Sequence, residues 1–275
     1  MGTKKTPLYD WHEAQKANIV EFGDYLMPVW YGSSKDEHLA VVTNAGLFDT
    51  SHMAVVRVHG PGSFDLLQWC FTRNLSACVG KDNAPIAPGK CVYGAFLDEH
   101  GHAIDDSIVY KAADEEYVVV VNAGMGGAIA AHLEANAKAK GLNARMTDMT
   151  DKLGKIDIQG PTAVKIMQKV LQTPEKVFDK LTYFSFKGHF DPASAFAGDA
   201  RLLDGTPLLL SRSGACRTFC MILTEAGPWM SILPSRSVMS VRRTSRPFLF
   251  ASRCAATAPP MPALTTTTYS SSATL

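Results

Sequence analysis

The sequence predicts an α+β fold. Short runs of β-branched and apolar residues, which predict strands, alternate along the chain with stretches of helical spacing. The strand candidates at residues 90–97 and 107–111 are separated by a Gly-containing turn at 98–101, which favours a hairpin. Hairpins and split units of this kind are typical of α+β proteins rather than of doubly wound parallel sheets.

The N-terminal region is predicted to contain a long irregular segment and one helix. Residues 11–31 mix apolar side chains with Gly and Pro, which suits a packed loop better than a long helix. Residues 33–45 predict a short helix, with Ser34 as the N-cap and Gly46 as its end.

The remaining elements follow from the same rules. Strands are predicted at 55–58, 117–121, 155–158, 183–187 and 208–211, and helices at 63–71, 126–140 and 162–171. Gly141 is suited to close the helix at 126–140. Gly60-Pro61 and Gly160-Pro161 both lie between a β-branched strand and an amphipathic helix, which two related αβ units side by side would explain.

The amino-acid composition changes at Ala215. Residues 1–214 contain 16 Lys, 5 Arg and 25 acidic residues, a formal charge of −4. Residues 215–275 contain 6 Arg, no Lys, one acid and no Asp, Asn, Gln or His, and 18 of these 61 positions are Ser or Thr. Translation in a wrong reading frame of GC-rich DNA explains this loss better than a folded domain does; a genuine disordered appendage is the alternative. We therefore expect two intertwined but incomplete α+β lobes at 1–214 and a non-native or disordered tail at 215–275.

Charge and hydropathy argue against several classes of protein. The formal net charge of +1 does not predict a basic nucleic-acid surface. The sequence has neither a signal peptide nor an apolar run of about 18 residues, so we expect no membrane association and a cytoplasmic location. Cys70, Cys78 and Cys91 lack CxxC spacing and predict free, mostly packed thiols rather than a metal site.

An acidic pair at the entrance of an apolar strand is the most informative local feature. Asp105 and Asp106 must point to opposite sides of a strand, so one carboxylate can face inward while its neighbour faces solvent. A buried carboxylate is costly unless it is hydrogen-bonded or protonated, which suits it to bind a polar N–H of a ligand. The alternative, which residue chemistry alone favours, is that the pair closes the hairpin.

Three other polar clusters favour structural interpretations. Residues 49–52, Asp-Thr-Ser-His, are sequence neighbours without a GxSxG elbow and predict a hydrogen-bonded turn rather than a catalytic triad. His100 and His102 lack a third metal ligand at suitable spacing and predict exposed loop residues. The Gly-rich residues 124–127 match neither GxGxxG nor a P-loop and predict a tightly packed helix start.

Several motifs in succession resemble the aminomethyltransferase, or T-protein, of the glycine cleavage system and its folate-binding relatives. They are TPLYDWH at 6–12, MP at 27–28, YGS at 31–33, EHLAV at 37–41, GLFDTSHM at 46–53, GP at 60–61, DDSIVY at 105–110, VNA at 121–123 and QGP at 159–161, with Tyr93 and Gly101. The resemblance covers about residues 6–214, in the family's order.

The resemblance implies a three-lobed α+β cloverleaf that holds tetrahydrofolate in a central cavity. It implies transfer of an aminomethyl group from the lipoyl arm of a carrier, the H-protein, to the folate with release of ammonia. Asp106 matches the family's carboxylate beside the reactive end of the pterin and is the catalytic candidate. The cofactor-binding candidates are Tyr93, Ile108, Tyr110, Asn122, Met53 and Tyr183. A folate pocket needs apolar and aromatic walls with a few placed polar groups, and these residue types supply both.

Departures from the family pattern leave alternatives open. After Gly214 the family's folate-contacting Tyr and Glu, a later Arg and the C-terminal barrel domain are absent, so the chain is expected to be a defective fragment. Arg57 occupies a usually apolar position, which leaves the one-carbon donor open. A folate-dependent demethylase of N-methyl or sulfonium donors is one alternative, and a non-enzymatic folate-binding iron–sulfur assembly factor is another.

Overall fold

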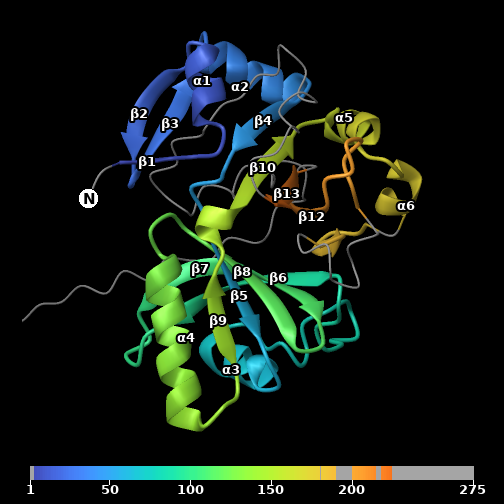
Figure 1. The fold of residues 1–275 in the computed structure, drawn as a ribbon. Helices are drawn as coiled ribbons and strands as arrows, with labels where there is room; N and C mark the ends of the chain where they lie inside the picture. The colour runs from blue at the N-terminus through green and yellow to red at the C-terminus, as the bar shows by residue number, and fades with distance from the viewer. Residues whose placement is uncertain (1–2, 180, 190–199, 215–217, 225–275) are drawn as a thin grey trace, which may run out of the picture. The chain divides into compact units, whose positions relative to one another are not determined.

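A ten-stranded sheet organises the described part of the chain, which in this computed structural model comprises residues 3–179, 181–189, 200–214 and 218–224 (Figure 1). By its contacts the chain divides into two units, Met1–Arg243 and Thr244–Leu275, and all described residues belong to the first. The strand order is β4-β10-β13-β12-β11-β6-β7-β8-β5-β9, with every neighbouring pair antiparallel. Helices packed on an antiparallel sheet confirm the predicted α+β class.

The bounds of the elements are as follows. The strands are β1 (Lys4–Lys5), β2 (Asn18–Phe22), β3 (Tyr25–Trp30), β4 (Gly46–Asp49), β5 (Ala54–His59), β6 (Lys90–Leu97), β7 (Ala103–Ala113), β8 (Glu116–Val121), β9 (Arg145–Asp148), β10 (Leu153–Gln159), β11 (Ser185–Lys187), β12 (Leu208–Gly214) and β13 (Thr218–Thr224). The helices are α1 (Tyr9–Ala14), α2 (Ser34–Thr43), α3 (Ser63–Cys70), α4 (Gly126–Lys140), α5 (Ala163–Val170) and α6 (Pro174–Phe178), with a 3₁₀ turn at Thr150–Lys152. Strands β1, β3 and β2 form a separate small sheet.

The strand order contains the same arrangement twice, read inward from the two edges. The series β4-β10-β13-β12-β11 corresponds to β9-β5-β8-β7-β6. In each half a Gly-Pro pair leads from an inner strand into a helix, with Gly60 at φ +111° and Gly160 at φ +122°. These positive φ values favour glycine. The symmetric order supports the two related units that the Gly-Pro repeats predict.

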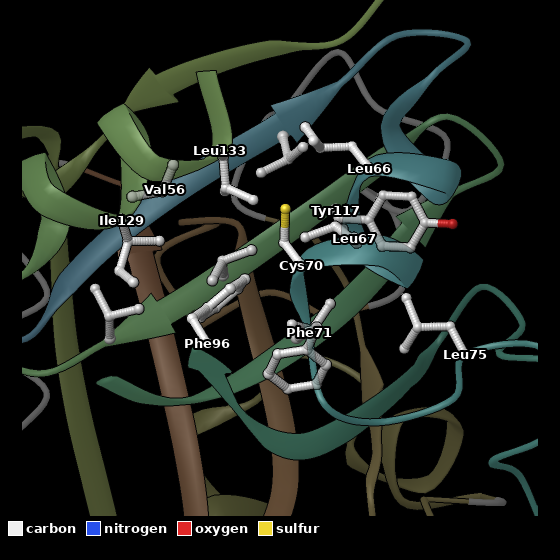
Figure 2. Packing of buried hydrophobic residues seen from close by; sticks show 14 of the residues in the cluster. Val56, Leu66, Leu67, Cys70, Phe71, Leu75, Phe96, Tyr117, Ile129 and Leu133 are labelled. Atoms are coloured by element: carbon white, nitrogen blue, oxygen red, sulfur yellow. The ribbon is translucent and has the colours of Figure 1, made fainter. Parts of the chain in front are cut away.

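The core of the first half lies between the sheet and the helices α3 and α4 (Figure 2). Leu66 and Leu67 of α3 and Ile129 and Leu133 of α4 are fully buried against Phe96 and its sheet neighbours. In the second half, α5 and α6 cover a corresponding core with β10 and β12. Helices therefore pack on one face of each half.

The opposite face of the sheet forms a third core that both halves share. Val55 and Val120 come from one half, and Leu153 and Leu209 come from the other, yet they pack in one cluster. Strands β5 and β10 are far apart in the strand order, so the sheet curls until these faces meet. We call this cluster the central core; it forms the floor of the candidate site.

The expectation of an irregular segment at 11–31 was wrong. Helix α1 and the β2–β3 hairpin occupy this region, and Gly23 at φ +58° makes the hairpin turn. Pro28 lies inside β3 next to the irregular register between Asn18 and Ile19, which accommodates its missing N–H. The Gly and Pro residues that suggested a loop are therefore turn and bulge positions within a small sheet.

The predicted ends of helix α2 also need correction. Ser33, not Ser34, is the N-cap, because its hydroxyl accepts a hydrogen bond from the Asp36 N–H at 3.3 Å. The helix ends at Thr43, and Gly46 begins strand β4 instead of ending the helix. The other predicted helices and strands are present within a few residues of their expected bounds.

Strand β13 lies beyond the predicted domain boundary at 214. Residues 218–224 pair with both β10 and β12, so the boundary falls inside a hairpin. The sequence of this strand, TFCMILT, is rich in residues that favour strands. Residues 225–275 lie outside the described residues, and the non-native or disordered character of the tail stays a prediction. Among the described residues, no helix is long and apolar enough to cross a membrane.

Candidate functional site

Antiparallel pairing places most of the candidate side chains on one face of the β6–β7 hairpin. Tyr93 pairs with Ile108, and Ala95 pairs with Asp106. Residues at alternate positions share a face, so Asp106, Ile108 and Tyr110 lie with Tyr93 on the side of the central core. The acidic pair lies within strand β7 and does not close the hairpin, because the turn follows Leu97. The hairpin-closing alternative was therefore wrong.

Asp105 is the more buried member of the pair and lies on the face of β7 opposite to Asp106. It is 9% exposed, and its two oxygens accept hydrogen bonds from Asn122, from the backbone N–H at 2.8 Å and from Nδ2 at 2.7 Å. Burial raises the pKa of Asp105, while the hydrogen bonds from Asn122 act in the opposite direction. The pairing explains how a buried carboxylate is tolerated here.

Asp106 is the less buried member of the pair, lies on the central-core side of the sheet and accepts two hydrogen bonds from neutral donors. The Tyr93 hydroxyl donates to Oδ2 at 2.9 Å, and Asn122 Nδ2 donates to Oδ1 at 2.9 Å. Burial, followed by the hydrogen bond to Asp106, raises the pKa of Tyr93 to about 12, so its phenol remains a donor at neutral pH. The carboxylate is thus held in place without a basic partner in these contacts.

The apolar candidates lie at and below the rim of the central core. Ile108 and Met53 are partly buried against it. Tyr110 is only 1% exposed, and its hydroxyl lies 3.4 Å from Ser211 Oγ. Tyr183 is half-exposed and stacks edge-on against Phe184 at 4.5 Å, just before β11. Hydrogen bonds join Tyr93, Asp106 and Asn122, and Ile108 and Met53 each pack against the central core. No hydrogen bond in the described ranges joins Tyr183 to that group.

The residues at 49–52 form the predicted structural turn. Asp49 Oδ1 accepts the Ser51 N–H at 3.0 Å, and Ser51 Oγ accepts the Lys155 N–H at 3.0 Å. The unexpected partner is His12, whose Nε2 lies 2.9 Å from Asp49 Oδ2 with both side chains fully buried. The two residues are 37 positions apart, and no local spacing relates them.

The remaining candidates have structural roles. His100 and His102 are exposed, and within the described part of the chain no group of three or more His, Cys, Asp or Glu could hold a metal. Cys70 and Cys78 are free thiols, Cys91 is buried, and burial raises the pKa of Cys70 to about 11. Residues 124–127 lead into α4, and the predicted tight packing is present at Gly126, where a Cβ would meet that of Ala54 at 2.8 Å. At Gly124 and Gly127 an added Cβ would meet no atom within 4 Å.

Comparisons with known proteins identify the class. A family model described as the GCVT N-terminal domain matches residues 8–192, and the chain belongs to this family. Curated relatives named aminomethyltransferase include those of Natranaerobius thermophilus, 34% identical over 211 residues, and Bdellovibrio bacteriovorus, 34% identical over 233 residues. They cover 77% and 84% of this chain. The alignments cover 51% and 58% of those relatives, so the chain spans little more than half their length.

A solved structure has the same fold. The glycine cleavage system aminomethyltransferase T from Bartonella henselae matches with a TM-score of 0.66 and 25% identity. The match covers 84% of this chain and 56% of that structure. The predicted resemblance to the T-protein family is therefore confirmed, as is its standing as a family of transferases.

Proposed function

We propose that this chain carries the folate-facing site of a tetrahydrofolate-dependent aminomethyltransferase. The donor is the aminomethyl group bound to a sulfur of the lipoyl arm of the H-protein. The products are ammonia, the freed lipoyl dithiol on the H-protein and a folate that carries the one-carbon unit. The observation that supports this most directly is the Asp106 carboxylate, held between Tyr93 and Asn122 at the edge of an apolar core.

The residues present suit a reduced folate. Asp106 has lone pairs beyond the two that Tyr93 and Asn122 use, and an ionised carboxylate accepts up to about four hydrogen bonds. Ile108, on the same face of β7 as Asp106, and Met53 pack against the central core and supply apolar surface. Tetrahydrofolate supplies the ring amine that accepts the one-carbon unit. The site therefore combines an apolar wall with an acceptor for N–H groups.

Asp106 is proposed to act through its charge. A carboxylate next to the reacting amine stabilises the positive charge that develops as ammonia leaves the donor. Hydrogen bonds from Tyr93 and Asn122 fix both oxygens, so little rearrangement is needed during the reaction. In this proposal, Asp106 orients the amine and stabilises charge, while the apolar core restricts water.

Asp106→Asn tests the proposal, with Asp98→Asn as the matched control. Both changes neutralise a hydrogen-bonded carboxylate of the same hairpin, but Asp98 lies in the turn and accepts the His100 and His102 N–H groups. We expect the full chain to bind tetrahydrofolate by calorimetry, D106N to bind at least about tenfold more weakly, and D98N to bind like the unmodified chain. An unmodified chain without folate affinity, or D106N with full affinity, would contradict the proposal.

Ammonia release distinguishes the reaction from its alternatives. The chain is mixed with tetrahydrofolate and aminomethylated lipoyl H-protein, and ammonia is measured. Turnover with N-methyl or sulfonium donors instead of the carrier would favour the demethylase. Folate retention without transfer from any donor would favour the assembly factor.

A further inference from the structure

We propose that Asp105 is a positioning residue, which fixes the side-chain amide of Asn122 and through it the orientation of Asp106. For its ligand, this inference rests on the proposed function. Its structural part concerns hydrogen bonds that exist without any ligand.

Asn122 bridges the two carboxylates with a single amide group. Its Nδ2 donates one hydrogen bond to Asp105 Oδ1 at 2.7 Å and another to Asp106 Oδ1 at 2.9 Å. An amide nitrogen has two hydrogens, so both are used. If the amide were rotated by half a turn, its oxygen would face two carboxylate oxygens. The network therefore fixes which end of the amide faces the acidic pair.

Asp105 is the rigid member of this network. Its Oδ2 also accepts the backbone N–H of Asn122 at 2.8 Å, so it holds that residue at two points. Asp105 is buried, whereas Asn122 is exposed at the end of β8. An exposed side chain would otherwise sample several rotamers. Asp105 limits Asn122 to one orientation without itself facing the central core.

The fixed amide determines what the site offers a ligand. Because both hydrogens of Nδ2 are used, Asn122 has its carbonyl oxygen left for a ligand, and it acts as an acceptor. Asp106 is likewise an acceptor. Together they select a ligand that has N–H groups on neighbouring atoms, as the edge of a reduced pterin has. Asp105 contacts no such ligand; its effect passes through Asn122.

A double-mutant cycle of Asp105→Asn and Asn122→Ala tests this route in the full-length chain. Each single variant is expected to weaken tetrahydrofolate binding about tenfold, the loss that one charge-assisted hydrogen bond represents. D105N is expected to cause no additional loss in the N122A background. D98N, which neutralises a carboxylate of the same hairpin, is expected to bind normally. Equal losses in both backgrounds, or full affinity of D105N, would overturn the proposal.

A second readout is independent of folate. In ¹⁵N-labelled protein, both side-chain amide hydrogens of Asn122 should show slowed exchange, and N122A identifies their signals. D105N should speed the exchange of at least one of them. If the unmodified chain binds no folate, the proposed function fails, and this measurement alone decides whether Asp105 holds Asn122: unchanged exchange in D105N overturns the inference. If D105N does not fold, N122A decides, because full folate affinity in N122A leaves Asp105 no route to the ligand.

Discussion

Replacing His12 with Ala should destabilise the chain strongly, because His12 is the buried hydrogen-bond partner of the buried Asp49 carboxylate. Its Nε2 lies 2.9 Å from Asp49 Oδ2, and both side chains are 0% exposed. On its other side, Nδ1 lies 2.7 Å from the Tyr31 hydroxyl. Helix α1, strand β4 and the residue that follows strand β3 therefore meet at this imidazole. In the variant, Asp49 would keep the Ser51 N–H but lose its buried partner.

The expected loss follows from burial. Breaking a buried pair by removing one partner typically costs about 3–5 kcal/mol, because a charge is left in an apolar environment. Domains are stable by only about 5–15 kcal/mol, so the loss is a large fraction of the total. For a chain of this size, about 2–4 °C of melting temperature corresponds to each kcal/mol. We therefore expect His12→Ala to melt at least about 6 °C lower, followed by circular dichroism.

The pair His102–Asp98 supplies the matched control. Its Nδ1–Oδ2 distance is 3.2 Å, close to that of the buried pair, but His102 is 79% exposed. His102→Ala should leave the melting temperature unchanged within error, because water replaces an exposed partner. If both variants melted alike, the argument that burial decides the worth of the His12 pair would be refuted.

Four further outcomes follow from the structure. Burial raises the pKa of Asp49, but the hydrogen bonds that this carboxylate accepts, led by that from His12, together with the charge interaction with His12 outweigh burial and lower the pKa. The stabilisation from this carboxylate is therefore present above its unfolded pKa of about 3.9 and is lost as the pH falls through the lower folded value. Urea midpoints between pH 5 and 2 should show a smaller drop in H12A. Burial, followed by the charge of Lys155, lowers the pKa of His52 to about 4. Between the unfolded pKa of about 6.5 and pH 4 the unfolded state binds more protons, so stability decreases by up to roughly 3 kcal/mol as the pH is lowered. His52→Gln should flatten this slope, and an unchanged slope would contradict the assignment. Gly160→Ala should prevent folding or cost several kcal/mol, because a Cβ there would lie 2.5 Å from the Asn44 carbonyl oxygen. Gly101→Ala, also at positive φ but with no atom within 4 Å, should cost only about 1 kcal/mol. Equal thermal shifts of the two variants would show that packing against the Gly160 turn is not tight. Arg57→Met should change the unfolding free energy by less than about 1 kcal/mol, since the 2.7 Å ion pair with Glu116 is partly exposed and lacks hydrogen-bond geometry. A larger loss, measured by urea unfolding, would mean that the pair is stronger than its exposure implies.

The local elements were predictable where periodicity and end signals agreed. Helix α4 runs from Gly126 to Lys140 and closes at Gly141 in the left-handed conformation at φ +64°, as its Ala-rich spacing and terminal glycine indicate. The β6–β7 hairpin was also predictable, because two apolar runs flank a polar turn. In the N-terminal region, Gly23 and Pro28 suggested a loop, since the pairing that turns them into a hairpin and a bulge position is not visible in local composition.

The sequence by itself determined the family, the alternation of Asp105 and Asp106 between two faces, and the residue types of the candidate site. Which aspartate is buried, and that Asn122 joins both, was decided only by the tertiary structure, because strand β8 must lie beside β7 for Asn122 to reach them. The His12–Asp49 pair has the same origin. Hydrogen bonds between residues far apart in the chain depend on register and sheet curvature, and packing of the whole sheet sets both.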